Sequence, residues 1–130
     1  MPEKVAHAVS PLVSVVDDDR SLLRAIGRLL RAAGFAVEAF PSAEQFLESW
    51  HPVVSRCLVL DVHLGGMTGF ELHDRLLEAG MPPPVIFITA HDDAATRERA
   101  RRAGAVQYLR KPFEDDALIS AINRATSPPR

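Results

Sequence analysis

Residues 57–61 read Cys-Leu-Val-Leu-Asp, an apolar run that ends in an acid. Residues 12–18, Leu-Val-Ser-Val-Val-Asp-Asp, follow the same pattern and end in two acids. Two further apolar runs end in polar groups of other kinds: residues 85–88 before Thr89, and residues 106–109 shortly before Lys111. In an open parallel sheet the carboxyl ends of the strands meet at one edge, and ligands bind in the crevice there. The sequence therefore predicts one crevice lined by three carboxylates, a hydroxyl and an ammonium group.

Apolar runs alternate with helical stripes five times along the chain. A second strand is expected at residues 35–40, and Gly34, Gly80 and Gly104 stand where three helices should stop. The clearest helices have these apolar stripes: Leu22, Leu23, Ile26, Leu29, Leu30 and Ala33; Leu72, Leu76 and Leu77; Leu118, Ile119, Ala121, Ile122 and Ala125. This alternation favours a parallel sheet with helices on both faces.

Two stretches have the sequence of a capping box, in which two residues three positions apart cap each other's backbone N–H groups. Ser42-Ala43-Glu44-Gln45 predicts the start of a short helix that ends near Trp50. Thr68-Gly69-Phe70-Glu71 predicts the start of the next helix. The fourth helix is expected to begin at Asp92 or Asp93, since aspartate is a preferred helix cap.

The composition is that of an ordinary globular chain of 130 residues, with a formal net charge of −2. We expect one domain at residues 11–125 and loose tails at residues 1–10 and 126–130. The charge does not indicate nucleic-acid or membrane binding, and no apolar run is long enough to span a membrane. Because the N-terminus lacks the apolar core of a signal peptide and the only cysteine lies in an expected buried strand, we expect a cytoplasmic protein.

Lysine is rare in this sequence, which contains 13 arginines against two lysines, Lys4 and Lys111. A compact ammonium group can fill a buried position that a planar guanidinium cannot. We therefore expect Lys111 to act in the crevice, and a surface cation is the alternative. The Lys111-Pro112 step is a candidate cis peptide bond.

Asp17, Asp18 and Asp61 should lie close together, because the first and third strands of a doubly wound sheet are neighbours. Three carboxylates within a few ångströms repel one another unless a cation neutralises them. Mg²⁺ suits such oxygen ligands, since one or two carboxylates, a backbone carbonyl and waters suffice to bind it. The alternative is that Asp18 or Asp19 merely caps the first helix.

Asp61 can also act as a nucleophile, because a carboxylate can attack phosphorus and form an acyl phosphate. Phosphoryl transfer requires mainly positioning and neutralisation of charge, which Mg²⁺ and Lys111 would supply from two sides. Thr89 can donate its hydroxyl to a phosphoryl oxygen, and the small Ala90 leaves access to it. An ordinary β-branched residue at a strand end is the alternative for Thr89.

With these residues in place, the chain resembles the receiver domain of two-component response regulators, especially the group that includes nitrogen-fixation and nodulation transcriptional regulators. The likeness extends over about residues 11–125. It rests on four stretches: Val15-Val16-Asp17-Asp18-Asp19, Leu58-Val59-Leu60-Asp61, Ile86-Phe87-Ile88-Thr89-Ala90-His91 and Leu109-Arg110-Lys111-Pro112-Phe113-Glu114. It implies a doubly wound (βα)5, flavodoxin-like three-layer sandwich whose parallel strands have the order 2-1-3-4-5.

The resemblance also implies a role for each residue of the site. The implied roles are phosphorylation of Asp61; Mg²⁺ binding by Asp17, Asp18, Asp61 and the backbone carbonyl of His63; phosphate binding and switching by Thr89, Ala90, Lys111 and Tyr108; and tuning of dephosphorylation by His63 and His91. Tyr108 would turn inward when Thr89 moves toward the phosphate. Exposed loop histidines without a role are the alternative for His63 and His91.

One stretch departs from the family pattern. Leu64-Gly65-Gly66 stands where the family usually has Met-Pro. Because glycine replaces a residue with a locked backbone angle, we expect this loop to be more flexible than usual.

The implied function is a phosphorylation-dependent signalling switch that receives its phosphoryl group from a sensor histidine kinase. The fourth helix, fifth strand and fifth helix would form its partner face, for a phosphorylation-dependent homodimer or a C-terminal DNA-binding output domain outside this chain. No membrane and no direct nucleic-acid contact are expected. Arg97, Arg99, Arg101 and Arg102 resemble a nucleic-acid patch, but Glu98 interrupts them and favours a solvated basic face.

Two other functions would use a similar arrangement. A phosphatase of the haloacid dehalogenase type also has a strand-end aspartate and Mg²⁺, but normally a second acid two residues later, where this chain has His63. A receiver fold kept only as a docking surface would not need the complete set of acids, hydroxyl and lysine. We therefore expect no enzyme activity beyond the chain's own phosphoryl transfer and dephosphorylation at Asp61.

Overall fold

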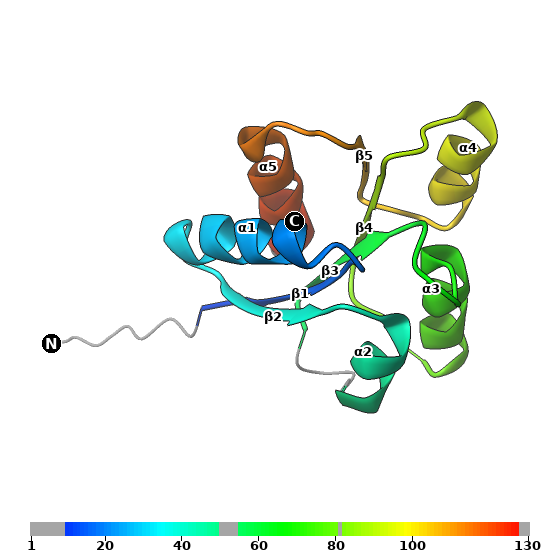
Figure 1. Cartoon of the computed structure of the whole chain (residues 1–130), viewed down its shortest axis with the longest axis horizontal. Coiled ribbons are helices and arrows are strands. Elements are labelled where there is room, and N and C mark those ends of the chain that lie inside the picture. Colours follow the sequence, from blue (N-terminus) through cyan, green and yellow to red (C-terminus); the bar gives the residue numbers. More distant parts are fainter. Residues whose placement is uncertain (1–9, 50–54, 81, 128–130) are drawn as a thin grey trace, which may run out of the picture.

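Within residues 10–49, 55–80 and 82–127, which the computed structural model describes, five parallel strands form one sheet and five helices pack against it (Figure 1). The strands are β1 (Leu12–Val16), β2 (Ala36–Phe40), β3 (Cys57–Asp61), β4 (Val85–Thr89) and β5 (Gln107–Arg110). The helices are α1 (Arg20–Ala32), α2 (Ala43–Ser49), α3 (Gly69–Glu78), α4 (Ala94–Arg102) and α5 (Asp115–Thr126). The sheet order is β2-β1-β3-β4-β5, which confirms the predicted doubly wound fold. No helix in this part of the chain has the length and apolarity needed to cross a membrane.

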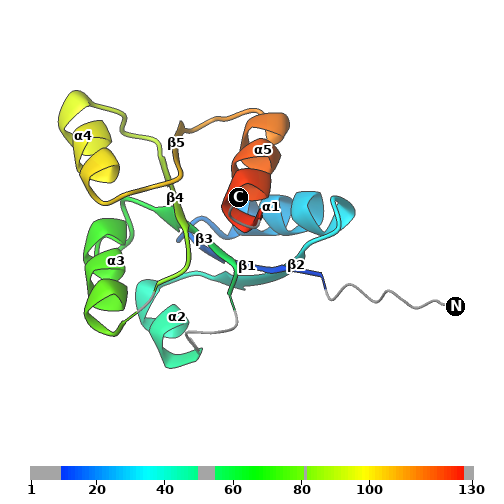
Figure 2. The same cartoon turned by 180° about the vertical axis from the view of Figure 1, so that it is seen from behind.

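Helices cover both faces of the sheet. α1 and α5 lie against one face, whereas α2, α3 and α4 lie against the other (Figure 1 and, from behind, Figure 2). Every residue of β3 and β4 is buried, because each of their faces meets a layer of helices. One apolar cluster joins Val59 and Ile88 to α1 and α5, and the other joins Leu58 and Phe87 to α2 and α3. This buried frame holds the strand ends that carry the candidate site.

The central strands extend one residue further toward the crevice than the sequence predicts. β3 and β4 include Asp61 and Thr89 as their last residues, and β5 is shifted by one residue to Gln107–Arg110. The extension follows from the parallel pairing, in which Asp61 lies beside Ile88 and Thr89 lies beside Arg110. Asp61 and Thr89 therefore belong to the hydrogen-bonded sheet and not to the loops that follow it.

Two side chains predicted to be buried are exposed. Leu77 leaves 49% of its surface exposed, and Ala33 is exposed as well. α3 turns Leu72, His73 and Leu76 toward the sheet, and position 77 lies about 100° further round the helix than position 76. Ala33 follows the last residue of α1 as its C-terminal cap, where the helical stripe no longer continues.

The predicted capping boxes are confirmed for α3 and half confirmed for α2. The Glu71 N–H donates to Thr68 Oγ1 at 3.0 Å, and the Thr68 N–H donates to Glu71 Oε1 at 2.8 Å. For α2, the described contacts include one bond of the box, from the Gln45 N–H to Ser42 Oγ at 3.1 Å. Trp50, expected near the end of α2, and most of the predicted tails lie outside the described residues.

His73 is a buried histidine that the apolar pattern of α3 did not reveal. It leaves 3% of its surface exposed, and its ring meets Phe87 edge to face with 5.8 Å between the centroids. Its Nδ1 atom has no hydrogen-bond partner among the described residues. Burial lowers the pKa of His73 below its usual value of 6.5, although Asp74 opposes the shift. The folded protein therefore keeps this imidazole neutral within an apolar layer.

We expect His73→Leu to reduce the loss of stability in mild acid. Below pH 6.5 the unfolded chain binds a proton at His73 while the folded chain resists it, so the free energy of unfolding falls with decreasing pH. Leucine fills a similar volume and binds no proton, so the variant lacks this contribution. Urea unfolding at about pH 7.5 and about pH 5 measures the difference. Equal losses in both proteins on acidification would contradict this origin of acid sensitivity.

Candidate functional site

The residues predicted to line the crevice come together at the carboxyl edge of the sheet. Asp17 follows β1, Asp61 ends β3, Thr89 ends β4 and Lys111 follows β5. The Lys111 ammonium donates to Asp17 Oδ2 at 2.7 Å and to Asp61 Oδ2 at 3.3 Å. Asp17, Asp61 and Thr89 are buried. The Lys111-Pro112 peptide bond is cis, as predicted.

The same local hydrogen bond orients three of these side chains. In each case the backbone N–H two residues further on donates to the side-chain oxygen: Asp19 to Asp17 Oδ1 at 2.9 Å, His63 to Asp61 Oδ1 at 3.1 Å, and His91 to Thr89 Oγ1 at 3.0 Å. Asp and Thr form such local turns readily. Because the backbone occupies Oδ1 of both aspartates, their Oδ2 atoms are left to contact Lys111.

Asp17, Asp18 and Asp61 form a cluster of carboxylates. Their ligand atoms all lie within 4.8 Å of one another. Asp17 and Asp61 are buried and Asp18 is exposed, so the cluster is open to solvent on one side. Asp19 caps α1 by accepting a hydrogen bond from the Leu22 N–H at 3.1 Å. The helix cap is therefore Asp19, and Asp18 belongs to the acidic cluster.

The charges of the cluster are only partly balanced. Burial, followed by the negative charge of Asp17, raises the pKa of Asp61 to about 6, although Lys111 opposes the shift. Burial disfavours the charged form of Lys111, but hydrogen bonds and charges from the two aspartates outweigh it and raise the pKa of Lys111. Lys111 is thus an ammonium ion at neutral pH. One ammonium cannot neutralise three carboxylates, so the cluster favours a further cation.

The donor set of the cluster fits a divalent cation. All three side chains offer carboxylate oxygens, the ligands that hard cations such as Mg²⁺ prefer. The backbone carbonyl of His63, predicted as a further donor, belongs to the loop that directly follows Asp61. The acidic triad is therefore typical of a metal-binding site.

Gly69 makes a close contact with the backbone at Asp61 and Val62, whereas the sequence pattern assigned it to a capping box. Its N–H donates to the Val62 carbonyl at 2.9 Å. A Cβ atom at position 69 would overlap the carbonyl oxygen of Asp61 and would lie 3.0 Å from its carbonyl carbon. Glycine therefore lets α3 begin directly against the end of β3.

The remaining predicted residues surround this cluster. Ala90, His63 and His91 are exposed, and the two histidine rings meet edge to face with 5.0 Å between their centroids. Tyr108 in β5 is half-buried, and its hydroxyl donates to Asp92 Oδ1 at 3.1 Å. Tyr108 thus contacts the loop between β4 and α4. Asp92, considered from the sequence only as a helix cap, is an additional residue of this region.

The sequence matches one protein family over almost its whole length. Residues 13–123 fit the family described as "Response regulator receiver domain". The chain belongs to the response regulator receiver domains. The resemblance inferred from the strand-end residues is confirmed.

Two relatives support the assignment to receiver domains. Nodulation protein W of Bradyrhizobium diazoefficiens is 44% identical over 115 residues, which cover 88% of this chain and 51% of the relative. Transcriptional regulatory protein FixJ of the same organism is 37% identical over 113 residues, which cover 87% of this chain and 55% of FixJ. The chain thus spans about half the length of these relatives.

A solved structure supports the assignment independently. The response regulator receiver protein from Burkholderia phymatum has a TM-score of 0.78 and 45% identity, with 93% of this chain and 100% of that protein covered. The receiver domain described here is a phosphorylation-dependent signalling switch with an acidic pocket of Asp17, Asp18 and Asp61. It is not a classical enzyme, so the alternative of a haloacid dehalogenase-type phosphatase is wrong.

Proposed function

We propose that a sensor histidine kinase transfers a phosphoryl group to Asp61. The observation that carries this proposal is the position of the Asp61 carboxylate, which ends a buried strand, lies in the acidic cluster and faces the Lys111 ammonium at 3.3 Å. This arrangement combines a nucleophile with a cation that can neutralise an incoming phosphoryl group. Residues 11–125 would form the receiver domain that carries the site.

The transfer forms a bond between a carboxylate oxygen of Asp61 and the phosphorus of a phosphohistidine. The phosphorus–nitrogen bond breaks, and its electron pair remains on the imidazole of the kinase. Lys111 already contacts Asp61 Oδ2 and would offset the added phosphoryl charge. Thr89 would donate its hydroxyl to a phosphoryl oxygen, and Ala90, small and exposed, would leave room for it.

Asp17, Asp18, Asp61 and the backbone carbonyl of His63 would hold Mg²⁺. The support for this set is the close approach of the three carboxylates and, among the described residues, the one ammonium group, that of Lys111, that contacts two of them. When bound, Mg²⁺ supplies positive charge beside the phosphoryl oxygens. Its binding would also relieve the repulsion between Asp17 and Asp61 that raises the pKa of Asp61.

Phosphorylation would be read out on the surface of α4, β5 and α5. Thr89 would move toward the phosphoryl group and Tyr108 would follow it inward, which changes that surface. His63 and His91 would tune dephosphorylation. They are exposed and lie two residues after Asp61 and Thr89, so both lie at the crevice edge.

The proposed partners are a sensor histidine kinase, a second phosphorylated copy that contacts the surface of α4, β5 and α5, and a DNA-binding output domain outside these 130 residues. The match to about half of FixJ, named a transcriptional regulatory protein, supports such an output.

We propose a cytoplasmic location without membrane contact. In support, Cys57, the one cysteine of the sequence, is buried in β3, which suits a reduced, structural cysteine.

The basic residues of α4 fit a solvated protein surface, and we propose no direct nucleic-acid contact. Each arginine of this helix lies beside an acid: Arg97 and Asp92 at 2.9 Å, Arg99 and Asp74 at 3.6 Å, Arg101 and Glu98 at 2.6 Å, and Arg102 and Glu98 at 3.7 Å. These acids offset the positive charge that phosphate binding would require.

We expect the wild-type protein to take up one phosphoryl group from acetyl phosphate when Mg²⁺ is present and none when a chelator removes it. The reason is that the three carboxylates repel the anionic donor until a divalent cation neutralises them. Intact-mass measurement follows the uptake, and reduction with borohydride followed by peptide mapping locates the acyl phosphate. A label found on Thr89 or on a histidine, or uptake that does not require Mg²⁺, would overturn the assignment of Asp61.

A further inference from the structure

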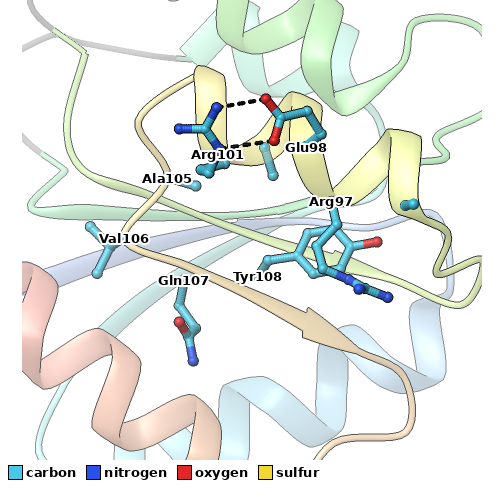
Figure 3. A pocket seen from close by; sticks show the side chains of 9 residues that line it. Arg97, Glu98, Arg101, Ala105, Val106, Gln107 and Tyr108 are labelled. Atoms are coloured by element: carbon cyan, nitrogen blue, oxygen red, sulfur yellow. Dashed lines mark hydrogen bonds and ion pairs between the residues drawn. The ribbon is translucent and has the colours of Figure 1, made fainter.

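Asp92 connects β5 to α4 through its side chain. Its Oδ1 atom accepts a hydrogen bond from the Tyr108 hydroxyl at 3.1 Å. Arg97 Nη2 contacts both carboxylate oxygens of Asp92 at 2.9 Å. The Asp92 side chain is 19% exposed, so this cluster is partly shielded from solvent. Arg97 and Tyr108 both line a cavity of about 440 Å³ between α4 and β5. Figure 3 shows their side chains next to each other.

Asp92 also belongs to the short segment 89–92 that begins at the strand end of β4. The Thr89 hydroxyl oxygen accepts a hydrogen bond from the His91 N–H at 3.0 Å, one residue before Asp92. Movement of this oxygen toward Asp61 therefore displaces or breaks the bond that positions the segment. The place of Asp92 thus depends on the place of the Thr89 hydroxyl.

We propose that Asp92 is a positioning residue, which holds the Tyr108 ring in its half-buried position, termed outward, in the unphosphorylated protein until movement of Thr89 displaces the segment 89–92. This proposal rests on the proposed function, in which phosphorylation of Asp61 draws Thr89 toward the phosphoryl group. It adds Asp92, held in place by Arg97, to the residues of the switch. These two residues set the fraction of unphosphorylated molecules whose tyrosine has already turned inward.

The chemistry of the cluster suits such a restraint. A hydroxyl bonded to a carboxylate is held more strongly than one bonded to a neutral acceptor. The contact of Arg97 with both oxygens fixes the carboxylate, so Tyr108 meets an acceptor that is already oriented. Burial and then the Asp92 hydrogen bond raise the pKa of Tyr108 to about 12, which keeps the donated proton on the hydroxyl at neutral pH.

The sequence allows a direct test, because Tyr108 is its single tyrosine. Protein that contains 3-fluorotyrosine gives a ¹⁹F NMR resonance from this ring alone. In the wild type we expect beryllofluoride with Mg²⁺, a mimic of the phosphoryl group, to move the resonance from an outward to an inward position. Asp92→Ala without beryllofluoride should raise the inward-to-outward ratio about tenfold, since it removes a hydrogen bond to a charged group.

Two further variants make the result specific. Arg97→Ala, at a side chain that is 59% exposed, should shift the resonance in the same direction but less, because Asp92 keeps its bond to Tyr108. Asp93→Ala removes the adjacent acid, which caps α4 through the Thr96 N–H at 2.7 Å, and should leave the resonance unchanged.

The outcomes distinguish the role of Asp92 from the phosphorylation switch itself. A wild-type resonance that does not respond to beryllofluoride would contradict the proposed function. A responsive wild type together with an Asp92→Ala resonance at the outward position would overturn the role of Asp92 alone. An equal shift in Asp93→Ala would also overturn it, because general loosening of the loop would then account for the effect.

Discussion

Gly69→Ala is expected to lower the free energy of unfolding by about 3 kcal/mol or more. The added Cβ atom would overlap the carbonyl oxygen of Asp61 and lie 3.2 Å from Val62 Cα, and both of these atoms belong to the backbone. Because β3 is buried and paired on both sides, it cannot move away without disturbing β1 and β4. Urea unfolding at constant pH measures the loss.

Gly65→Ala is the matched control, because it lies four residues before Gly69 in the loop between β3 and α3. Among the residues that the structure describes, a Cβ atom at position 65 would meet only Asp18 Oδ2, at 4.0 Å. We expect a change within about 0.5 kcal/mol, as for an ordinary surface substitution. Similar losses in Gly65→Ala and Gly69→Ala would show that the loop is generally intolerant of side chains and that the contact with Asp61 is not the cause.

The expected effect at Gly69 extends to function. A shift of the Asp61 backbone would move its carboxylate relative to Lys111, whose ammonium lies 3.3 Å from Oδ2. Uptake from acetyl phosphate should therefore fall in Gly69→Ala even under conditions where most of the protein is folded. Gly65→Ala should retain uptake, because its Cβ atom has no contact with the backbone of β3.

The fold and most of the candidate site could be predicted because both depend on features that are local in sequence. β3 is a short apolar run that ends in an acid, and its five residues are buried between two helical layers. Asp61 and Lys111 are 50 residues apart, yet the parallel arrangement alone places their strand ends at one edge. Strand direction and strand order are therefore sufficient to predict which residues meet at this edge of the sheet.

The features that could not be predicted depend on how elements meet. The apolar stripe of α3 favoured Leu77 as a buried residue, but the rotation of the helix against the sheet buries His73 in that layer. The role of Gly69 depends on the distance between the start of α3 and the end of β3. Asp92 accepts a hydrogen bond from Tyr108, which lies 16 residues later in the sequence. The preference of aspartate for helix caps pointed to a different role.

Asp61→Asn is expected to abolish the Mg²⁺-dependent phosphoryl uptake completely. The asparagine side chain has nearly the same shape, and its single amide oxygen can still accept the hydrogen bond from the His63 N–H, so the fold should be kept. Its amide is not a nucleophile toward phosphorus, however. Intact-mass measurement after incubation with acetyl phosphate tests the loss. Asp74→Asn, at an exposed aspartate on α3, is the control and should take up phosphoryl as the wild type does.

The same variant should be more stable than the wild type at neutral pH in the absence of Mg²⁺. Burial and Asp17 raise the pKa of Asp61 from 3.8 to about 6. Between these values the unfolded chain releases the proton while the folded chain keeps it, so wild-type stability falls as the pH rises through this window. Asparagine has no such proton. The free energy of unfolding of the variant should therefore exceed that of the wild type by about 1–2 kcal/mol at neutral pH, allowing for solvent screening at the open side of the cluster.

Thermal unfolding at about pH 4 and about pH 7, with and without Mg²⁺, tests this origin of the difference. Mg²⁺ should stabilise the wild type more than Asp61→Asn, because the cation relieves a repulsion that the variant has already lost. An Asp61→Asn protein that is less stable than the wild type at neutral pH would mean that the Lys111 contact outweighs burial and Asp17. The charge of Asp61 would then stabilise the fold, and the acidic pocket would not depend on a divalent cation to relieve it.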